Sequence, residues 1–119
     1  MKYTALRPIL RTNQFDETIT FYTGILGFTV GGQSDEWASL HKDEVEIMIS
    51  KPNLHVPFDQ PAFTGSLYLN TDDLDGLWDK VKDQASICYQ PENFEWGMRE
   101  FAIYDNNGYT LQFGQPLNK

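Results

Sequence analysis

Alternating apolar and polar residues along the first half of the chain predict short β-strands around one amphipathic helix. The predicted strands cover residues 3–12, 28–31, 36–41 and 45–50, and the predicted helix covers residues 13–26. Apolar side chains recur at helical spacing within this helix, and glycines close it. The first half therefore has the predicted element order β-α-β-β-β.

The second half of the chain predicts the same order of elements. They are a strand at residues 66–71, a helix beginning at Asp72 or Asp73, a strand at residues 87–89, a loop at residues 91–97 and a hairpin over residues 101–115. The two apolar runs of the hairpin are joined by the sequence DNNG, which places glycine where a left-handed residue is needed. This turn is the strongest local signal in the chain.

The similar order of the two halves predicts a duplicated module. Aligning the halves sets Leu10 on Leu69 and keeps both the apolar phase and the position of the hairpin turn. We therefore expect a single domain, residues 1–119, with one module at about residues 1–55 and a second at about residues 63–119. A proline-rich stretch lies between the two modules.

Strand alternation divides each predicted sheet into an apolar face, which the helix covers, and an open face. The residues predicted for the open faces are Arg7, Ile9, Arg11, Glu46, Met48, Ser50, Ser66, Tyr68, Asn70, Thr110 and Gln112. This mixed, mainly polar set has two interpretations. It either lines a hydrated cup that holds a ligand or simply faces solvent.

Composition narrows the possible functions. The 119 residues are 40% hydrophobic, which argues against disorder, and the net charge of -8 argues against nucleic acid as a partner. No apolar run is long enough to span a membrane, and the first ten residues lack the features of a signal peptide. The single cysteine, Cys88, agrees with a reducing compartment, so we expect a cytoplasmic protein. We expect Cys88 itself to be buried and unreactive.

Three motifs resemble one known family. They are FDETITFYTGILGF at residues 15–28, SLYLNTDDLDGLWDKV at residues 66–81 and WGMREFAIYDNNGYTLQF at residues 96–113. All three are similar to the glyoxalase/bleomycin-resistance/extradiol-dioxygenase superfamily, the vicinal oxygen chelate proteins; Asn106 stands where the family commonly has proline. The resemblance implies an α+β fold in which two β-α-β-β-β modules form a curled mixed sheet around a cleft, usually in a homodimer.

Enzymes of this family mostly hold a divalent metal with histidine and glutamate. The corresponding positions here are occupied by Arg7, Met48, Ser66 and Gln112. None of these side chains is a good ligand, because a divalent ion needs carboxylate, imidazole or thiolate donors. We therefore expect neither a metal nor another cofactor. The two histidines, His41 and His55, are predicted to lie at the surface, and no titratable partner can be placed beside Glu46 or Glu100.

Aromatic residues in strands and loops suggest what the cleft could hold instead. Together with the four positions that correspond to the family's metal ligands, these aromatic residues give the predicted ligand-binding set: Arg7, Trp37, Met48, Phe58, Ser66, Tyr68, Phe94, Trp96, Phe101 and Gln112. Trp96 and Gly97 resemble the Trp-Gly of bleomycin-resistance proteins, where aromatic rings help to clamp a flat, cationic drug. Each ring has the alternative role of filling the core or an interface between subunits.

Three functions remain open from the sequence. The first is a metal-free homodimer that sequesters a planar small molecule, a cationic one in the manner of bleomycin-type antibiotic resistance, without turning it over. Arg7 and Arg11 favour instead a ligand that carries a carboxylate. The second function is a lyase, isomerase or dioxygenase-related enzyme with a non-standard metal site. The third is a structural or regulatory partner of another protein.

Overall fold

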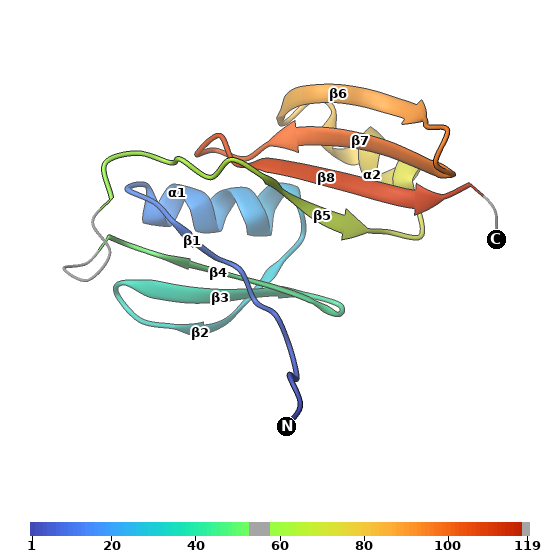
Figure 1. Cartoon of the computed structure of the whole chain (residues 1–119). Coiled ribbons are helices and arrows are strands. Elements are labelled where there is room, and N and C mark those ends of the chain that lie inside the picture. Colours follow the sequence, from blue (N-terminus) through green and yellow to red (C-terminus); the bar gives the residue numbers. More distant parts are fainter. Residues whose placement is uncertain (53–57, 118–119) are drawn as a thin grey trace. The chain divides into compact units, whose positions relative to one another are not determined.

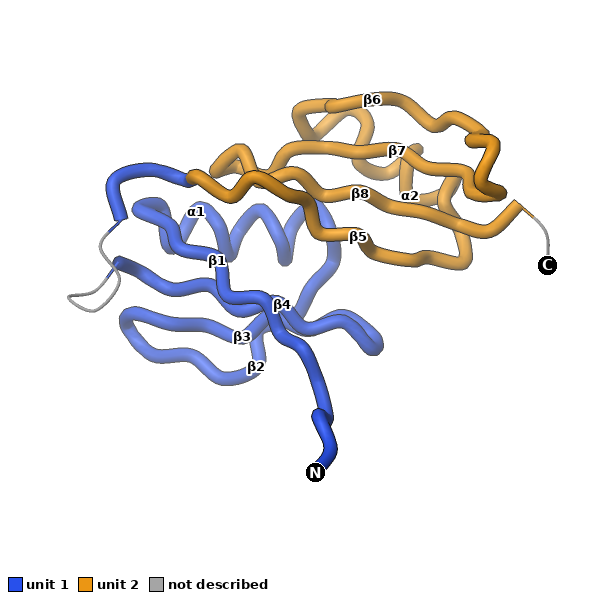
Figure 2. The backbone as a smooth tube through the Cα atoms, in the orientation of Figure 1, with its two compact units in different colours: residues 1–61 blue, residues 62–119 orange. Residues whose placement is uncertain are grey.

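Each half of the chain forms a four-stranded mixed sheet with helical segments on one face (Figure 1). A computed structural model describes residues 1–52 and 58–117, and His55 lies outside these residues. The chain divides into unit 1, residues 1–61, and unit 2, residues 62–119 (Figure 2). The duplication of a module stays a prediction from the sequence.

Unit 1 contains one mixed sheet whose first strand is parallel to its last. Its elements are β1 (Ile9–Arg11), α1 (Phe15–Thr20), the π-helical turn η1 (Phe21–Ile25), β2 (Thr29–Gln33), β3 (Trp37–Lys42) and β4 (Val45–Ser50). The strand order is β1-β4-β3-β2, with antiparallel pairing between β2, β3 and β4. The order of elements along the chain is thus β-α-β-β-β.

Unit 2 repeats this topology. Its elements are β5 (Ser66–Asn70), α2 (Leu74–Val81), β6 (Ser86–Asn93), β7 (Met98–Tyr104) and β8 (Thr110–Pro116). The strand order is β5-β8-β7-β6, and β5 is parallel to β8. The predicted α+β class with two β-α-β-β-β modules is therefore confirmed.

The core of unit 1 lies between its sheet and α1. Ile47 and Ile49 alternate along β4 toward this face, and both are almost fully buried, as are Leu40 and Tyr22. The ammonium group of Lys51 lies 5.4 Å from the centroid of the Phe15 ring, so its charge is placed over an aromatic face. Alternation along β4 thus sends apolar side chains to the helix and leaves Glu46 and Met48 on the opposite face.

Aromatic rings dominate the core of unit 2. The Phe101 ring packs edge-on against Trp78 of α2 and is stacked on Phe113, each at a centroid distance of 5.2 Å. Phe101 has no exposed surface, and burying a side chain of this kind stabilises the fold by roughly 1.5–3 kcal/mol. The expectation that Phe101 contacts a ligand does not hold here, because the register pairs it with Phe113 on the face that α2 covers.

The start of the chain differs from its prediction. Strand β1 covers three residues instead of residues 3–12, and Tyr3 and Leu6 are more than nine-tenths exposed. β-Propensity alone cannot extend a strand, because each added residue needs backbone partners on a neighbouring strand. The predicted helix over residues 13–26 is present, but its second half widens into η1.

Strand β6 is longer than predicted and takes in part of the predicted loop at residues 91–97. It lies at the edge of its sheet, and its register against β7 shifts between Ile87 and Tyr89. Cys88 sits at this shift and is exposed, so the expectation of a buried cysteine is wrong. An irregular edge strand can turn a side chain outward that regular alternation would direct inward.

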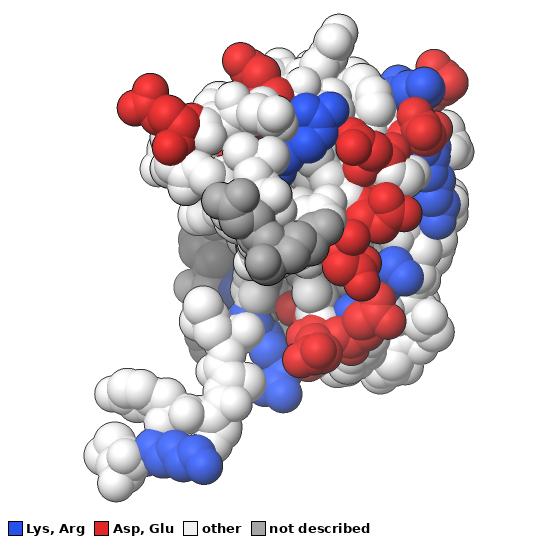
Figure 3. Space-filling view, turned by 90° about the vertical axis from the view of Figure 1, so that its right-hand side faces the viewer, with Lys and Arg blue, Asp and Glu red and all other residues white. Residues whose placement is uncertain are grey.

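Charged side chains of both signs are interspersed on the face drawn in Figure 3, without a continuous basic surface. This distribution agrees with the net charge of -8 and gives no support to nucleic-acid binding. Among the described residues, none of the helical segments reaches the length and apolar character of a membrane-spanning helix.

The N-terminus of α2 provides a stability test. A side-chain oxygen of Asp73 accepts a hydrogen bond of 3.1 Å from the Gly76 N–H, which confirms one of the two predicted caps. Asp73→Ala is expected to lower the free energy of unfolding by about 1 kcal/mol, because a helix donor loses its partner. Urea unfolding followed by circular dichroism measures the change. The control is Asp72→Ala, and equal losses in the two variants would contradict the capping role of Asp73.

Candidate functional site

A hydrogen-bonded network centred on Glu100 occupies the open face of unit 2. Glu100 is only 4% exposed, although it lies on the side of β7 opposite to α2. Its Oε2 atom accepts hydrogen bonds from the Tyr68 hydroxyl at 2.7 Å and from the Trp96 indole N–H at 3.1 Å. Its Oε1 atom accepts one from the Tyr89 hydroxyl at 3.2 Å. Three neutral donors on three different elements therefore surround one carboxylate.

Ser66 and Gln112 extend this network along β5 and β8. The Ser66 hydroxyl donates to the Gln112 Oε1 atom, and the Gln112 Nε2 group donates to the Tyr89 oxygen at 2.9 Å. The amide of Gln112 thus uses its acceptor oxygen and one of its N–H donors within the sheet. The structure brings together two of the four positions that the family resemblance assigned to metal ligands.

The close approach of Tyr68 to the sheet requires a glycine on β8. A Cβ atom added at Gly114 would lie 2.0 Å from the Tyr68 hydroxyl oxygen, a distance that no side chain could tolerate unless the phenol moved. Gly114 is paired with Glu100 in the register of β7 and β8. The glycine therefore leaves the space through which the Tyr68 hydroxyl reaches Glu100.

An aromatic stack borders the network at the turn between β6 and β7. The rings of Phe94 and Trp96 are parallel within 9°, with centroids 4.6 Å apart, and Tyr89 packs edge-on against Phe94 at 6.0 Å. Trp96 is 63% exposed even though its N–H is bound to Glu100. A large aromatic surface is thus held in one orientation and remains open to a ligand.

The network changes the acidity of its two phenols. Tyr68 is 43% exposed as a whole, but the burial of its hydroxyl end raises its pKa to about 12, with further increases from its hydrogen bond to Glu100 and from the negative charge of that carboxylate. Burial also raises the pKa of Tyr89, against an opposing effect of the hydrogen bond from Gln112. Both phenols therefore stay protonated at neutral pH and act as hydrogen-bond donors to Glu100.

The open face of unit 1 has a charged cluster at one end. The Arg7 guanidinium and the Ser39 hydroxyl both donate to the Glu46 carboxylate, and Ser39 also lies 2.9 Å from Nε2 of His41. The hydrogen bond from Ser39, followed by that from Arg7, lowers the pKa of Glu46. The expectation that neither Glu46 nor Glu100 has a titratable partner is therefore wrong, because Arg7 and His41 flank the first and two tyrosines flank the second.

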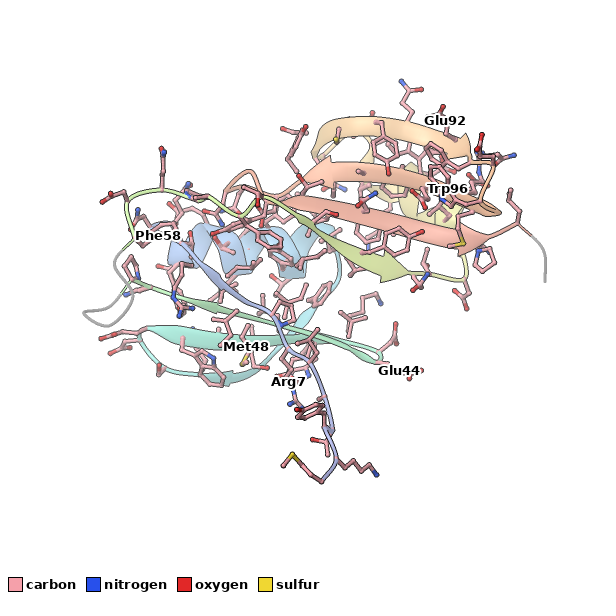
Figure 4. All side chains as sticks on the ribbon, in the orientation of Figure 1. Arg7, Glu44, Met48, Phe58, Glu92 and Trp96 are labelled. Carbon is pink, nitrogen blue, oxygen red and sulfur yellow. The ribbon has the colours of Figure 1, made fainter. Side chains whose placement is uncertain are left out.

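Trp37 lies on the same face of unit 1, toward the other end of the sheet, where it is paired with Ser50. Its indole Nε1 is 3.3 Å from the Met48 sulfur, and a Cβ atom at Gly32 would lie 3.1 Å from the far edge of the indole ring. Figure 4 shows Arg7 and Met48 on the side of the sheet away from α1. The structure thus pairs Trp37 with Met48, whereas Arg7 pairs with Glu46.

The predicted site residues fall into separate groups. Unit 2 brings together Ser66, Tyr68, Phe94, Trp96 and Gln112, and unit 1 brings together Trp37 and Met48. Phe58 is half-buried in the segment before unit 2. Sequence analysis missed Tyr89, Glu100 and Gly114 as parts of the site. The alternation of β7 against the apolar Phe101 and Ile103 was the signal that could have placed Glu100 on the open face.

The residues at the family's metal positions do not fit a divalent ion. Arg7 is a permanent cation, Met48 is a neutral thioether, and Ser66 and Gln112 are uncharged and already bonded to each other. Within residues 1–52 and 58–117, no cluster of three or more His, Cys, Asp or Glu side chains could hold a metal ion. No reaction step through a metal can be derived from these residues.

The repeated topology and the polar open faces define a class of proteins built from paired β-α-β-β-β modules. Within that class, the sequence model of the Glyoxalase/Bleomycin resistance protein/Dioxygenase superfamily matches residues 3–113. The chain belongs to this superfamily. A comparison with curated protein sequences returns no match.

Solved structures of the same fold include bleomycin-binding proteins. A bleomycin resistance determinant encoded on transposon Tn5 is 25% identical, with a TM-score of 0.77 and coverage of 96% of this chain and 98% of that one. A bleomycin-binding protein in complex with bleomycin is also 25% identical, with a TM-score of 0.75 and coverage of 95% and 98%. A glyoxalase/bleomycin resistance protein/dioxygenase from Nocardioides, 15% identical with a TM-score of 0.83, covers 99% of this chain and 86% of its own and shows the fold alone.

The raised pKa of Tyr68 predicts a loss of stability in alkali. The ordinary pKa is 10.0 and the folded value is about 12, so the hydroxyl ionises first in the unfolded chain. Its contribution to stability is full below about pH 10 and declines as the pH rises toward 12. Tyr68→Phe, which removes this titration, is expected to flatten the fall in the free energy of unfolding across that window. Urea unfolding at a series of pH values measures it, and parallel curves for the two proteins would refute the assignment.

Proposed function

We propose that the protein binds a planar small molecule without a metal, on the open face of unit 2. The observation that supports this most directly is the Phe94–Trp96 stack, whose exposed indole is hydrogen-bonded to the buried Glu100. A flat ligand can stack on the exposed ring, and each well-placed aromatic contact contributes about 0.5–1.5 kcal/mol. The network behind the stack fixes the ring before the ligand arrives, which limits the loss of entropy on binding.

Charge on this face favours a ligand with a cationic group. Glu100 is surrounded by neutral donors, and Glu92 lies opposite it in the register of β6 and β7. Arg99, the nearest arginine along the chain, pairs with Asp75 and Asn93 instead. A cation over the Trp96 ring would gain from both the ring and the carboxylates. Figure 4 labels Glu92 and Trp96 in this part of unit 2.

The proposal extends to the biological setting. The likeness to a bleomycin resistance determinant and to a bleomycin-binding protein supports sequestration of a drug-like compound as the activity and antibiotic resistance as its consequence. We include a homodimer in this proposal because the family resemblance implies one. The single cysteine supports a cytoplasmic location.

A pair of matched dyes tests the binding chemistry. Aminoacridine is a planar cation at neutral pH, whereas acridine has nearly the same shape and is neutral. Tryptophan fluorescence is expected to show tighter binding of aminoacridine. Glu100→Gln is expected to reduce its affinity by about tenfold, because the carboxylate charge is removed, and to weaken acridine less, because acridine loses only the anchoring of the Trp96 ring. Trp96→Ala is expected to weaken both dyes.

The control for this experiment is Asp83→Asn, which removes an exposed charge just beyond α2. It should leave both affinities unchanged. Equal affinity of the two dyes for the wild type, or equal loss in Asp83→Asn and Glu100→Gln, would remove the charge argument. Bleomycin, titrated in parallel, tests the resemblance directly.

Metal analysis distinguishes binding from catalysis. The purified protein is expected to contain no stoichiometric Ni, Zn, Fe or Mn after dialysis, and its affinity for aminoacridine should not change when a chelator is added. Elemental analysis and a titration with and without the chelator measure these quantities. A tightly held metal that supports turnover would replace the binding proposal with an enzyme of the same fold.

A further inference from the structure

Three side chains form a row across the open face of unit 1, at the end opposite to the Arg7–Glu46 pair. Arg11 of β1 is paired with Ser50 of β4, and Ser50 is paired with Trp37 of β3. Residues that are direct partners across neighbouring strands point to the same face. The row therefore places a guanidinium, a hydroxyl and an indole side by side on three adjacent strands.

The hydroxyl in the middle of this row has no hydrogen-bond partner. Ser50 is 9% exposed, and its Oγ atom is buried and unpaired. The backbone around it is engaged, since the Ser50 carbonyl accepts from the Thr12 N–H at 3.0 Å and the next N–H donates to the Glu36 carbonyl at 2.9 Å. A buried hydroxyl without a partner costs stability, so its presence calls for a group that it can bind.

The two neighbours of Ser50 define what that group can be. Arg11 is half-buried and carries a permanent positive charge with five N–H donors, so it can keep its contacts within the protein and still donate to a ligand. Trp37 offers a flat apolar surface. Its orientation is fixed by the contact of its indole N–H with the Met48 sulfur and by the close packing of the ring against Gly32. The row combines an anion-binding end with an aromatic surface.

We infer that Arg11, Ser50 and Trp37 form a subsite for an aromatic carboxylate. The carboxylate accepts hydrogen bonds from the Arg11 guanidinium and the Ser50 hydroxyl, and the aromatic part of the ligand stacks on Trp37. The charge of Arg7, at the other end of the face, is already neutralised by Glu46. This subsite lies wholly within unit 1 and does not depend on the cation-binding proposal for unit 2.

A carboxylate and its neutral amide test the subsite. Naphthoate and naphthamide have almost the same shape and differ in charge, and the indole N–H resonance of Trp37 in NMR titrations reports binding at this row. Naphthoate is expected to shift this resonance in a saturable manner, and naphthamide to bind at least about tenfold more weakly. Arg11→Gln is expected to abolish the difference between the two compounds, while Arg11→Lys keeps part of it because the charge remains without the planar fork.

Ser50→Ala separates a ligand-binding role from a structural one. It is expected to weaken naphthoate binding by about tenfold, while the thermal stability of the ligand-free protein stays the same or rises because an unpaired buried polar atom is removed. The charge control is Lys42→Gln, since Lys42 is exposed and pairs with Asp43 in the hairpin turn. It should bind naphthoate like the wild type.

Three results would overturn the inference. They are the absence of a naphthoate-induced shift at Trp37, equal affinity for naphthoate and naphthamide, and unchanged naphthoate binding in both Arg11→Gln and Ser50→Ala. If the Ser50 hydroxyl merely binds an ordered water, naphthoate will not shift the Trp37 resonance. If the aminoacridine experiment fails and the naphthoate experiment succeeds, the protein binds carboxylates but not planar cations. The two proposals can therefore fail separately.

Discussion

The carboxylate of Glu100 is the group on which the open face of unit 2 depends. A buried charge is costly unless hydrogen bonds replace its lost hydration, and here Tyr68, Tyr89 and Trp96 supply them. Each donor comes from a different element, so the contacts tie β5, β6 and the β6–β7 turn to β7. The hydrogen bond from Trp96 also holds its exposed indole in place. The same carboxylate therefore stabilises the sheet locally and orients the proposed binding surface.

The two units use one topology for different chemistry. In unit 1, the carboxylate of Glu46 meets the Arg7 guanidinium, and charge is neutralised within the face. In unit 2, the carboxylate of Glu100 is held by neutral donors, and its negative charge is retained. A repeated backbone fixes where side chains lie but leaves their charges to the sequence, which is how the same fold can host unrelated functions.

Local signals in the sequence were reliable where the physics is local. The cap of α2, predicted at Asp72 or Asp73 and found at Asp73, and the predicted turn that ends in Gly108, with its positive φ of 90°, depend only on neighbouring residues. The full bounds of β4 were also predicted, because strict alternation marks a half-buried strand. The length of β1 and the exposure of Cys88 were not, since they depend on backbone partners in another strand and on a register shift.

The sequence by itself determined the order of elements, the apolar faces, the resemblance to the superfamily and the poor metal-ligand chemistry of Arg7, Met48, Ser66 and Gln112. These features follow from residue type and spacing. Only the tertiary structure decided that Phe101 belongs to the core, that Glu100 is surrounded by donors and that the Ser50 hydroxyl is buried without a partner. Each of these depends on which strands are neighbours and in which register, because a shift of one residue in the pairing would exchange the two faces of a strand.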